Sequence, residues 1–359
     1  MTDIKKFMVQ YKALQYSLLA CSASHLHFVD AAPWMQELAL VYYSNSVKGL
    51  SEALREGAQL KNDDAFLTSV ILLYIHGCMG RGTYTDIPLH VNAATRILKL
   101  RLLSSSGNIS RPFDRLAIES VFYQIFLVTT GSWSDPLELD YHFDAGFWLQ
   151  AERLLAQSNL YLGCSIGFNS PVIGVPIALV RIVLSLKQFY QSPSQPDQGT
   201  LDQIRAELDE WESLVYSGQD LDHLSEHERP ILNLQMYRDA GYLYILTSSL
   251  LLYQLSGKTR TPGPPQAVPR TCWQMKTILH ILRGYRDNDD WARLLLGNWP
   301  VYSVGFFMSH SEDIWLIRND LQRRWDLVKF SQVSRFRTDL ESTWNLRGYD
   351  IDTSCWLGP

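Results

Sequence analysis

The chain has 359 residues, of which 46% are hydrophobic and 19% charged, and its formal net charge at pH 7 is −5. This composition predicts a large buried core and argues against direct nucleic-acid binding, because duplex-binding surfaces carry concentrated positive charge. The five cysteines include no CxxC pair, which disfavours a disulfide framework and indicates a reducing compartment. We therefore expect an intracellular protein, with the choice between nucleus and cytoplasm left open.

The first clear helix signal follows Asn62-Asp63-Asp64, a sequence typical of a helix N-terminus. From Phe66 to Ile75 the segment is hydrophobic almost all round, which predicts a central, fully buried helix. Earlier in the chain, Pro33 is placed near a helix start, where proline is favoured. By contrast, the segment 201–214 has one apolar stripe between charged residues and is predicted to lie on the surface.

A long buried helix is predicted from Ile231 to Leu255, and the stretch from Ala240 to Gly257 is apolar enough to raise the question of a membrane span. It contains Thr247, Ser248 and Gln254, which favours a buried core helix over a bilayer-spanning one. No membrane contact is expected.

The fold class predicted from these patterns is all-α, because no stretch alternates with period two for long enough to require a sheet. We expect a multi-helix α-α bundle or superhelical array with a central apolar pocket. It would form one large domain over residues 1–359, with sub-lobes at 1–190 and 200–350.

Three local motifs suggest chemistry but lack the context that the chemistry needs. Gly163 to Gly167 fits G-x-S-x-G without the strand that a serine hydrolase requires, and His223 to His227 fits H-x-x-E-H without a third metal ligand. The acids around Asp289 are explained by a helix cap. We interpret the first motif as a connector between helices and the second as a turn, and expect neither a cofactor nor a metal.

Towards the C-terminus, Gly297-Asn298-Trp299-Pro300 precedes the apolar run VYSVGFFMS. A proline inside a helix removes one N–H and frees the carbonyl four residues earlier, here that of Leu296. The sequence therefore predicts a kinked helix at this signature.

The signature and several earlier segments occur together in a recognisable order. The earlier segments include ALQYSLLACSASHL (13–26), VYYSNSVKGLSEAL (41–54), LHVNAATRIL (89–98), SPVIGVPIALVRIVLSL (170–186) and YRDAGYLYILTSSLLL (237–252). This order resembles the regulatory domain of fungal binuclear-zinc-cluster transcription factors over about residues 13–347. The resemblance implies an all-helical body that receives metabolites or partner proteins.

The DNA-reading part of that family is a six-cysteine cluster that holds two zinc ions, and this sequence contains no such cluster. We therefore expect no zinc-cluster domain in this chain. Whether such a module precedes it in the natural protein stays open.

Candidate site residues are polar or aromatic groups set within apolar helices, because a buried polar group must find a partner. The catalytic candidates are His76, Arg81, Tyr84 and His90, which fall close together in the sequence. The substrate-binding candidates are Tyr74, Trp133, Asp135, Trp148, Tyr237, Trp299 and His310.

Two functions remain open at this point. The first is a regulatory body, resembling fungal transcription factors of secondary metabolism, that binds a small hydrophobic metabolite or a partner protein, with homodimerisation left open. The second is a cofactor-independent biosynthetic enzyme on the same fold, which would be a cyclase, a pericyclase such as a Diels-Alderase, or an isomerase. Its substrate would be a polyketide or terpenoid natural-product intermediate.

Overall fold

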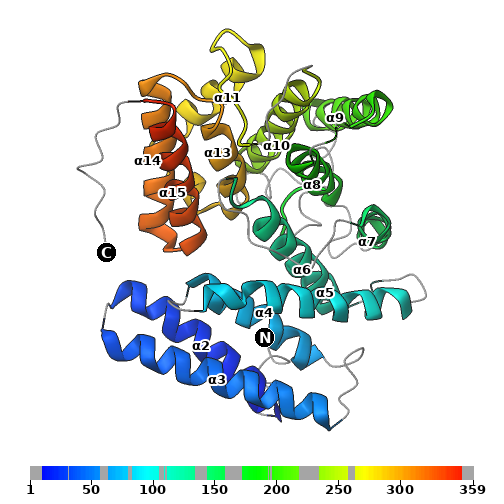
Figure 1. The fold of residues 1–359 in the computed structure, drawn as a ribbon, viewed down its shortest axis with the longest axis vertical. Helices are drawn as coiled ribbons and strands as arrows, with labels where there is room; N and C mark the ends of the chain where they lie inside the picture. Colours follow the sequence, from blue (N-terminus) through cyan, green and yellow to red (C-terminus); the bar gives the residue numbers. More distant parts are fainter. Residues whose placement is uncertain are drawn as a thin grey trace. The chain divides into compact units, whose positions relative to one another are not determined.

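The structure is a computed structural model, and it describes residues 10–30, 32–56, 64–79, 83–104, 109, 111–133, 144–157, 172–192, 194, 196–217, 234–257 and 263–349. All regular secondary structure in these ranges is helical (Figure 1), which confirms the predicted all-α class.

The chain divides into two compact units. Unit 1 comprises Met1–Val128, Leu137–Leu160 and Lys329–Ser331, and unit 2 comprises Thr129–Pro136, Tyr161–Val328 and Gln332–Pro359. The boundaries of these units differ from those of the predicted sub-lobes, 1–190 and 200–350. The assignment of one large domain stays a prediction.

Unit 1 is built on a group of closely packed helices near the N-terminus. Its elements are α2 (Lys12–Val29), α3 (Pro33–Arg55), α4 (Asp64–Met79), the short 3-10 helix η1 (Tyr84–Asp86), α5 (Ile87–Ser104), α6 (Pro112–Thr130) and α7 (Ala145–Gln157). As predicted, α4 is a core helix, and Leu67 and Leu73 are completely buried. Pro33 is the first residue of α3, where its missing N–H would have no helical partner.

Small residues allow α2 and α3 to approach closely, and the two helices lie side by side in Figure 1. The hydroxyl oxygens of Ser17 and Ser46 are 2.6 Å apart, and a Cβ atom on Gly49 would lie 3.3 Å from that of Ala13. This contact positions the residues of α3 against the neighbouring helix α4, which also packs on α2.

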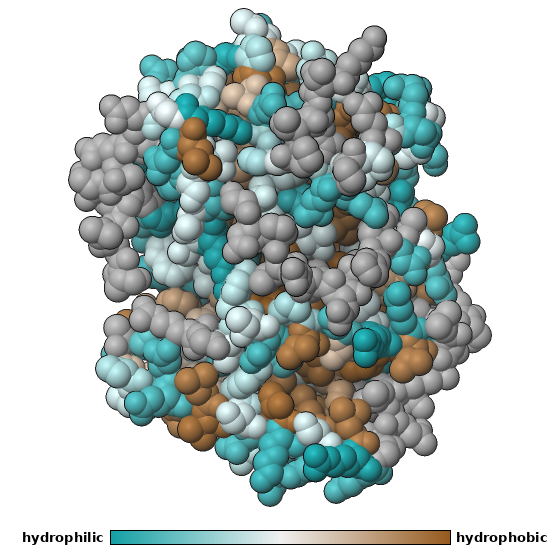
Figure 2. All heavy atoms as spheres, viewed as in Figure 1, coloured by the Kyte–Doolittle hydropathy of each residue, from teal (hydrophilic) through white to brown (hydrophobic). Residues whose placement is uncertain are grey.

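Large apolar side chains also reach the surface of unit 1. Apolar surface gathers in the lower part of the face drawn in Figure 2, and the exposed large hydrophobic residues of α2, α3 and α5 include Leu26, Val29, Trp34, Val41 and Leu89. The expectation of a protein partner or a homodimer nevertheless stays a prediction.

Unit 2 contains the C-terminal helices. They are α8 (Ile177–Gln191), α9 (Gln198–Ser217), α10 (Leu234–Leu255), α11 (Trp273–Gly284), α12 (Asp289–Arg293), the 3-10 helix η2 (Leu295–Gly297), α13 (Asn298–Gly305), α14 (Ser311–Val328) and α15 (Ser331–Leu346). Helix α10 is a core helix, as predicted, with Leu243 and Leu246 completely buried. Within the described ranges, no helix is both long enough and apolar enough to span a bilayer.

The predicted kink at Pro300 is wrong. Pro300 is the third residue of α13, and η2 precedes that helix. N–H groups in the first turn of a helix have no intrahelical acceptor, so the proline removes no helical hydrogen bond.

A buried arginine explains the polar residues of the same signature. Arg324 of α14 is completely buried, and its Nη1 donates to the carbonyl of Leu294 at 2.8 Å and to Oδ1 of Asn298 at 3.0 Å. Its Nε donates to Asp320, which also accepts from Nε1 of Trp291 at 2.8 Å. The signature thus serves to hold α14 against the start of α13.

Candidate functional site

A polar network in unit 1 brings together two of the predicted catalytic residues. His76 lies in the last turn of α4 and His90 in the first turn of α5. Between them lies Tyr43 of α3, whose ring is stacked on His76 with centroids 4.9 Å apart and meets His90 edge-on at 5.7 Å. The three rings therefore form one interhelical cluster.

Hydrogen bonds extend this cluster to a carboxylate. The Tyr43 hydroxyl is 2.8 Å from Oδ2 of Asp86 and 3.0 Å from Nε2 of His90. A phenol has one proton, which it donates to the stronger acceptor, the carboxylate. Its oxygen then accepts from His90, which must carry its proton on Nε2. Asp86, Tyr43 and His90 thus form a chain of carboxylate, phenol and imidazole.

His76 is the second imidazole of the cluster and is completely buried. Its Nδ1 is 2.8 Å from the hydroxyl of Ser24 on α2, whereas its Nε2 has no hydrogen-bond partner among the described residues. A buried polar atom without a partner is costly, and such atoms are rare in folded proteins.

Burial keeps both imidazoles neutral. It lowers the pKa of His76, and it lowers the pKa of His90 to about 4, although the negative charge of Asp86 opposes both shifts. Burial and the hydrogen bond to Asp86 raise the pKa of Tyr43. At neutral pH the cluster therefore contains two neutral imidazoles and a protonated phenol, groups that can donate or accept a proton.

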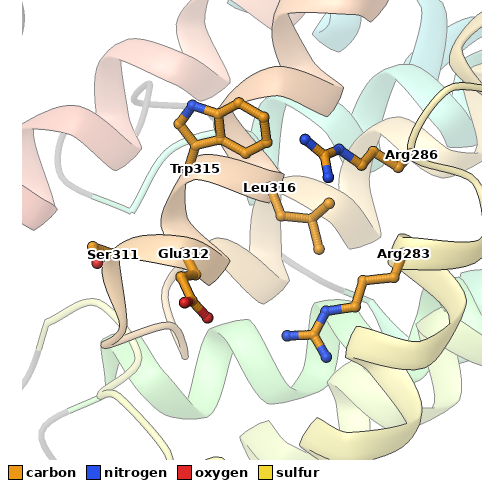
Figure 3. Close-up of a pocket in the computed structure, with 6 residues that line it drawn as sticks. All are labelled: Arg283, Arg286, Ser311, Glu312, Trp315 and Leu316. Atoms are coloured by element: carbon orange, nitrogen blue, oxygen red, sulfur yellow. The ribbon is translucent and has the colours of Figure 1, made fainter.

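A cavity of about 710 Å³ opens on unit 2 between the end of α11 and the start of α14. We call it the Trp315 groove, and its lining residues are Arg283, Arg286, Ser311, Glu312, Trp315 and Leu316. Figure 3 shows Trp315 and Leu316 opposite the two arginines. Trp315 is 46% exposed, and the guanidinium carbon of Arg286 lies 4.7 Å from the centroid of its ring.

Ion pairs occupy one end of the groove. The side chain of Asp313 is buried and accepts from Nε and Nη2 of Arg270, both at 2.7 Å, and from Nη2 of Arg283 at 3.2 Å. Nη2 of Arg270 also lies 3.0 Å from Glu312. Arg286, at the other end, has no carboxylate within ion-pair distance among the described residues.

The model of the fungal specific transcription factor domain matches residues 4–357. The chain belongs to this family. No curated protein and no solved structure matches it.

The other predicted site residues of this fungal transcription factor domain have separate surroundings. In unit 1, Tyr84 begins η1, Tyr74 is buried on α4, and Trp148 is buried edge-on against Phe122 with centroids 4.2 Å apart. In unit 2, Trp299 stacks on Tyr244 at 5.0 Å, whereas Tyr237 and His310 are exposed. Arg81 and Asp135 lie outside the described residues.

Trp133 belongs to a second buried polar cluster of the fungal transcription factor domain, which includes the almost completely buried Lys187. Lys187 Nζ donates to the carbonyl of Ser132 at 2.9 Å and lies 3.6 Å from the centroid of the Trp133 ring. Asp339 accepts from the Trp133 backbone N–H at 2.8 Å and from the Tyr302 hydroxyl. Burial lowers the pKa of Lys187 to about 7, and the charge of Asp339 opposes this shift.

Sequence reasoning missed several of these residues, although some signals were present. Lys187 lies in the mostly apolar segment 177–190, and Trp315 lies among the charged residues of the segment 312–320. Tyr43 and Asp86 carry no such signal, because their roles depend on how α3 packs. In the described ranges of the domain, no three His, Cys, Asp or Glu side chains gather closely enough to hold a metal ion.

Proposed function

We propose that the chain is the ligand-receiving regulatory body of a transcription-factor-like protein, and that a small hydrophobic metabolite binds in the Trp315 groove. The groove itself is the observation that carries this proposal. Its volume of about 710 Å³ falls within the range of small-molecule sites, roughly 300–1,000 Å³. Trp315 and Leu316 supply an apolar surface, and polar groups are placed around it.

Regulation would follow from the position of the groove between two helices. A ligand that contacts both α11 and α14 binds best when the two helices are held at this separation. The ligand therefore increases the population of that arrangement. The size of the shift is set by how much more tightly the ligand binds this arrangement than the alternative one. A partner surface that depends on the arrangement would be exposed or hidden accordingly.

The test uses the full chain and two matched tryptophan variants. Trp315 lines the groove and is 46% exposed, whereas Trp273 at the start of α11 is 52% exposed and is absent from the described lining. Hydrophobic metabolites would be screened by thermal shift, and a ligand at about 100 times its Kd stabilises the native state by about 2.7 kcal/mol. We expect ligands that stabilise the wild type and Trp273→Ala but not Trp315→Ala.

A reporter assay would connect binding with regulation. The full chain, fused to an unrelated DNA-binding domain, should change reporter transcription when the ligand is added, and Trp315→Ala should abolish the response. The proposal would be contradicted if a ligand stabilised Trp315→Ala as much as the wild type. It would also be contradicted if a ligand that binds left reporter transcription unchanged.

The cluster of Tyr43, His76, His90 and Asp86 favours a second candidate function, a cofactor-independent cyclase or isomerase acting on a polyketide or terpenoid substrate. His90 would move a proton, Asp86 would orient Tyr43, and the unpartnered Nε2 of His76 would bind a polar group of the substrate.

This second function predicts time-dependent product formation when the chain is incubated with such intermediates. His90→Ala should reduce the rate more than Tyr42→Phe, a change at the neighbouring tyrosine on α3. Turnover that survives His76→Ala, His90→Ala and Tyr43→Phe would exclude this cluster as a catalytic site.

A further inference from the structure

We infer that the Trp315 groove binds an amphipathic organic anion, with a carboxylate on Arg286 and an apolar body against Trp315 and Leu316. This inference rests on the proposed function, because both place the ligand in the same groove, and it adds the chemical class of the ligand.

The charges around the groove do not balance. Among the residues that the structure describes, three guanidinium groups, those of Arg270, Arg283 and Arg286, lie near two carboxylates, those of Glu312 and Asp313. Arg270 and Arg283 are both paired with Asp313, and Arg270 also reaches Glu312. The unmatched positive charge lies on Arg286.

The contact with Trp315 prepares Arg286 for a planar anion. Its guanidinium carbon lies over the indole ring, 4.7 Å from the ring centroid, which limits the positions that the group adopts. The N–H donors of a guanidinium point outward in its own plane, where a carboxylate can accept two of them at once. Because the ring already orients the guanidinium, less side-chain freedom is lost on binding.

The remaining groups select against other ligands. A purely apolar molecule that covered Arg286 would desolvate its donors without replacing their hydrogen bonds. A cation would have to compete with Arg270 for Glu312 and would be repelled by Arg286. An acidic peptide would need a longer surface than the six side chains that line this groove.

Two fluorescent probes separate the anionic part from the apolar part. They are 8-anilinonaphthalene-1-sulfonate and its uncharged parent, N-phenyl-1-naphthylamine, which differ only by the sulfonate. Titration of the full chain should give a Kd about tenfold lower for the anionic probe, since one charge-assisted hydrogen-bonded pair is worth at least this much. Dodecanoate should displace the anionic probe, and dodecanol should do so only at much higher concentration.

Three variants assign the effect to the groove. Arg286→Gln should raise the Kd of the anionic probe about tenfold and leave the Kd of the neutral probe nearly unchanged. Trp315→Ala should weaken both probes. Arg293→Gln is the matched control, because Arg293 is exposed, lies on α12 and is absent from the described lining. It should change neither affinity.

The outcomes distinguish this inference from the proposed function. If the two probes bind equally well, or if Arg286→Gln leaves the anionic probe unaffected, the anion assignment is overturned and a neutral ligand remains compatible with the groove. If Trp315→Ala alters neither probe, the groove is not the binding site and both proposals fail. Displacement by a glutamate-rich peptide but not by dodecanoate would overturn the inference in favour of a protein partner.

Discussion

Gly297 lies directly against the guanidinium of Arg324, so that no space is left for a side chain at residue 297. A Cβ atom on residue 297 would lie 2.7 Å from Nη2 and 3.0 Å from Nη1 of Arg324. The guanidinium cannot move aside freely, because it is buried and bonded to Leu294, Asn298 and Asp320. Glycine at this position is therefore required by an arginine on another helix.

Gly297→Ala should destabilise the protein by about 1–3 kcal/mol, since a displaced Arg324 leaves buried acceptors without their donor. Urea denaturation would measure the change. Gly284→Ala, at the end of α11, is the control, because no atom lies within 4 Å of its added Cβ. Equal stability of the two variants would show that Arg324 makes room for the added methyl group without a loss of stability.

Tyr43→Phe should also lower the free energy of unfolding by about 1–3 kcal/mol, because the change removes the hydroxyl shared by Asp86 and His90. The matched variant is Tyr42→Phe, which should stay within about 0.5 kcal/mol of the wild type. Equal losses in the two variants would indicate that the shared hydroxyl adds nothing to stability.

The low pKa of His90 predicts sensitivity to acid. The folded state holds His90 neutral down to about pH 4, whereas the unfolded chain protonates it near its ordinary pKa of 6.5. Between these values the unfolded state binds more protons, so stability falls as the pH decreases from 6.5 to 4. Thermal unfolding followed against pH should show a smaller acid loss in His90→Gln than in the wild type. His280→Gln, at an exposed position on α11, should retain the wild-type slope.

Lys187 predicts a second pH dependence, at higher pH. Its pKa is about 7 in the folded state and 10.5 in the unfolded chain, so the unfolded state binds more protons between these values. Stability contributed by this residue therefore rises from pH 7 towards pH 10.5. Lys187→Met should remove this rise in urea denaturation at pH 6 and pH 9, while the exposed Lys276→Met should not. A slope that survives in Lys187→Met would have to come from another group.

The fold could be predicted further than the site, and the reason is physical. The burial of a helix such as α4 or α10 can be predicted from its own sequence, because its apolar side chains lie on all of its faces. The kink at Pro300 was predicted wrongly because the sequence does not show that a 3-10 helix ends just before α13.

The candidate sites depend on contacts that local sequence does not encode. His76 and His90 are close in the chain and could be grouped, but Tyr43 joins them only through the packing of α3. In the Trp315 groove, Arg283 and Trp315 come from different helices, and only the register of α11 against α14 brings them to one cavity. The predicted roles of the site residues stay predictions.

The amide of Trp133 and the carboxylate of Asp339 are separated by 206 residues. During synthesis, the earlier partner leaves the ribosome long before the later one exists. At about 5–20 residues per second, this interval lasts roughly 10–40 seconds. Throughout this interval the segment around Trp133 must stay free of aggregation without its contact to Asp339, and a chain that ends before residue 339 cannot form that contact.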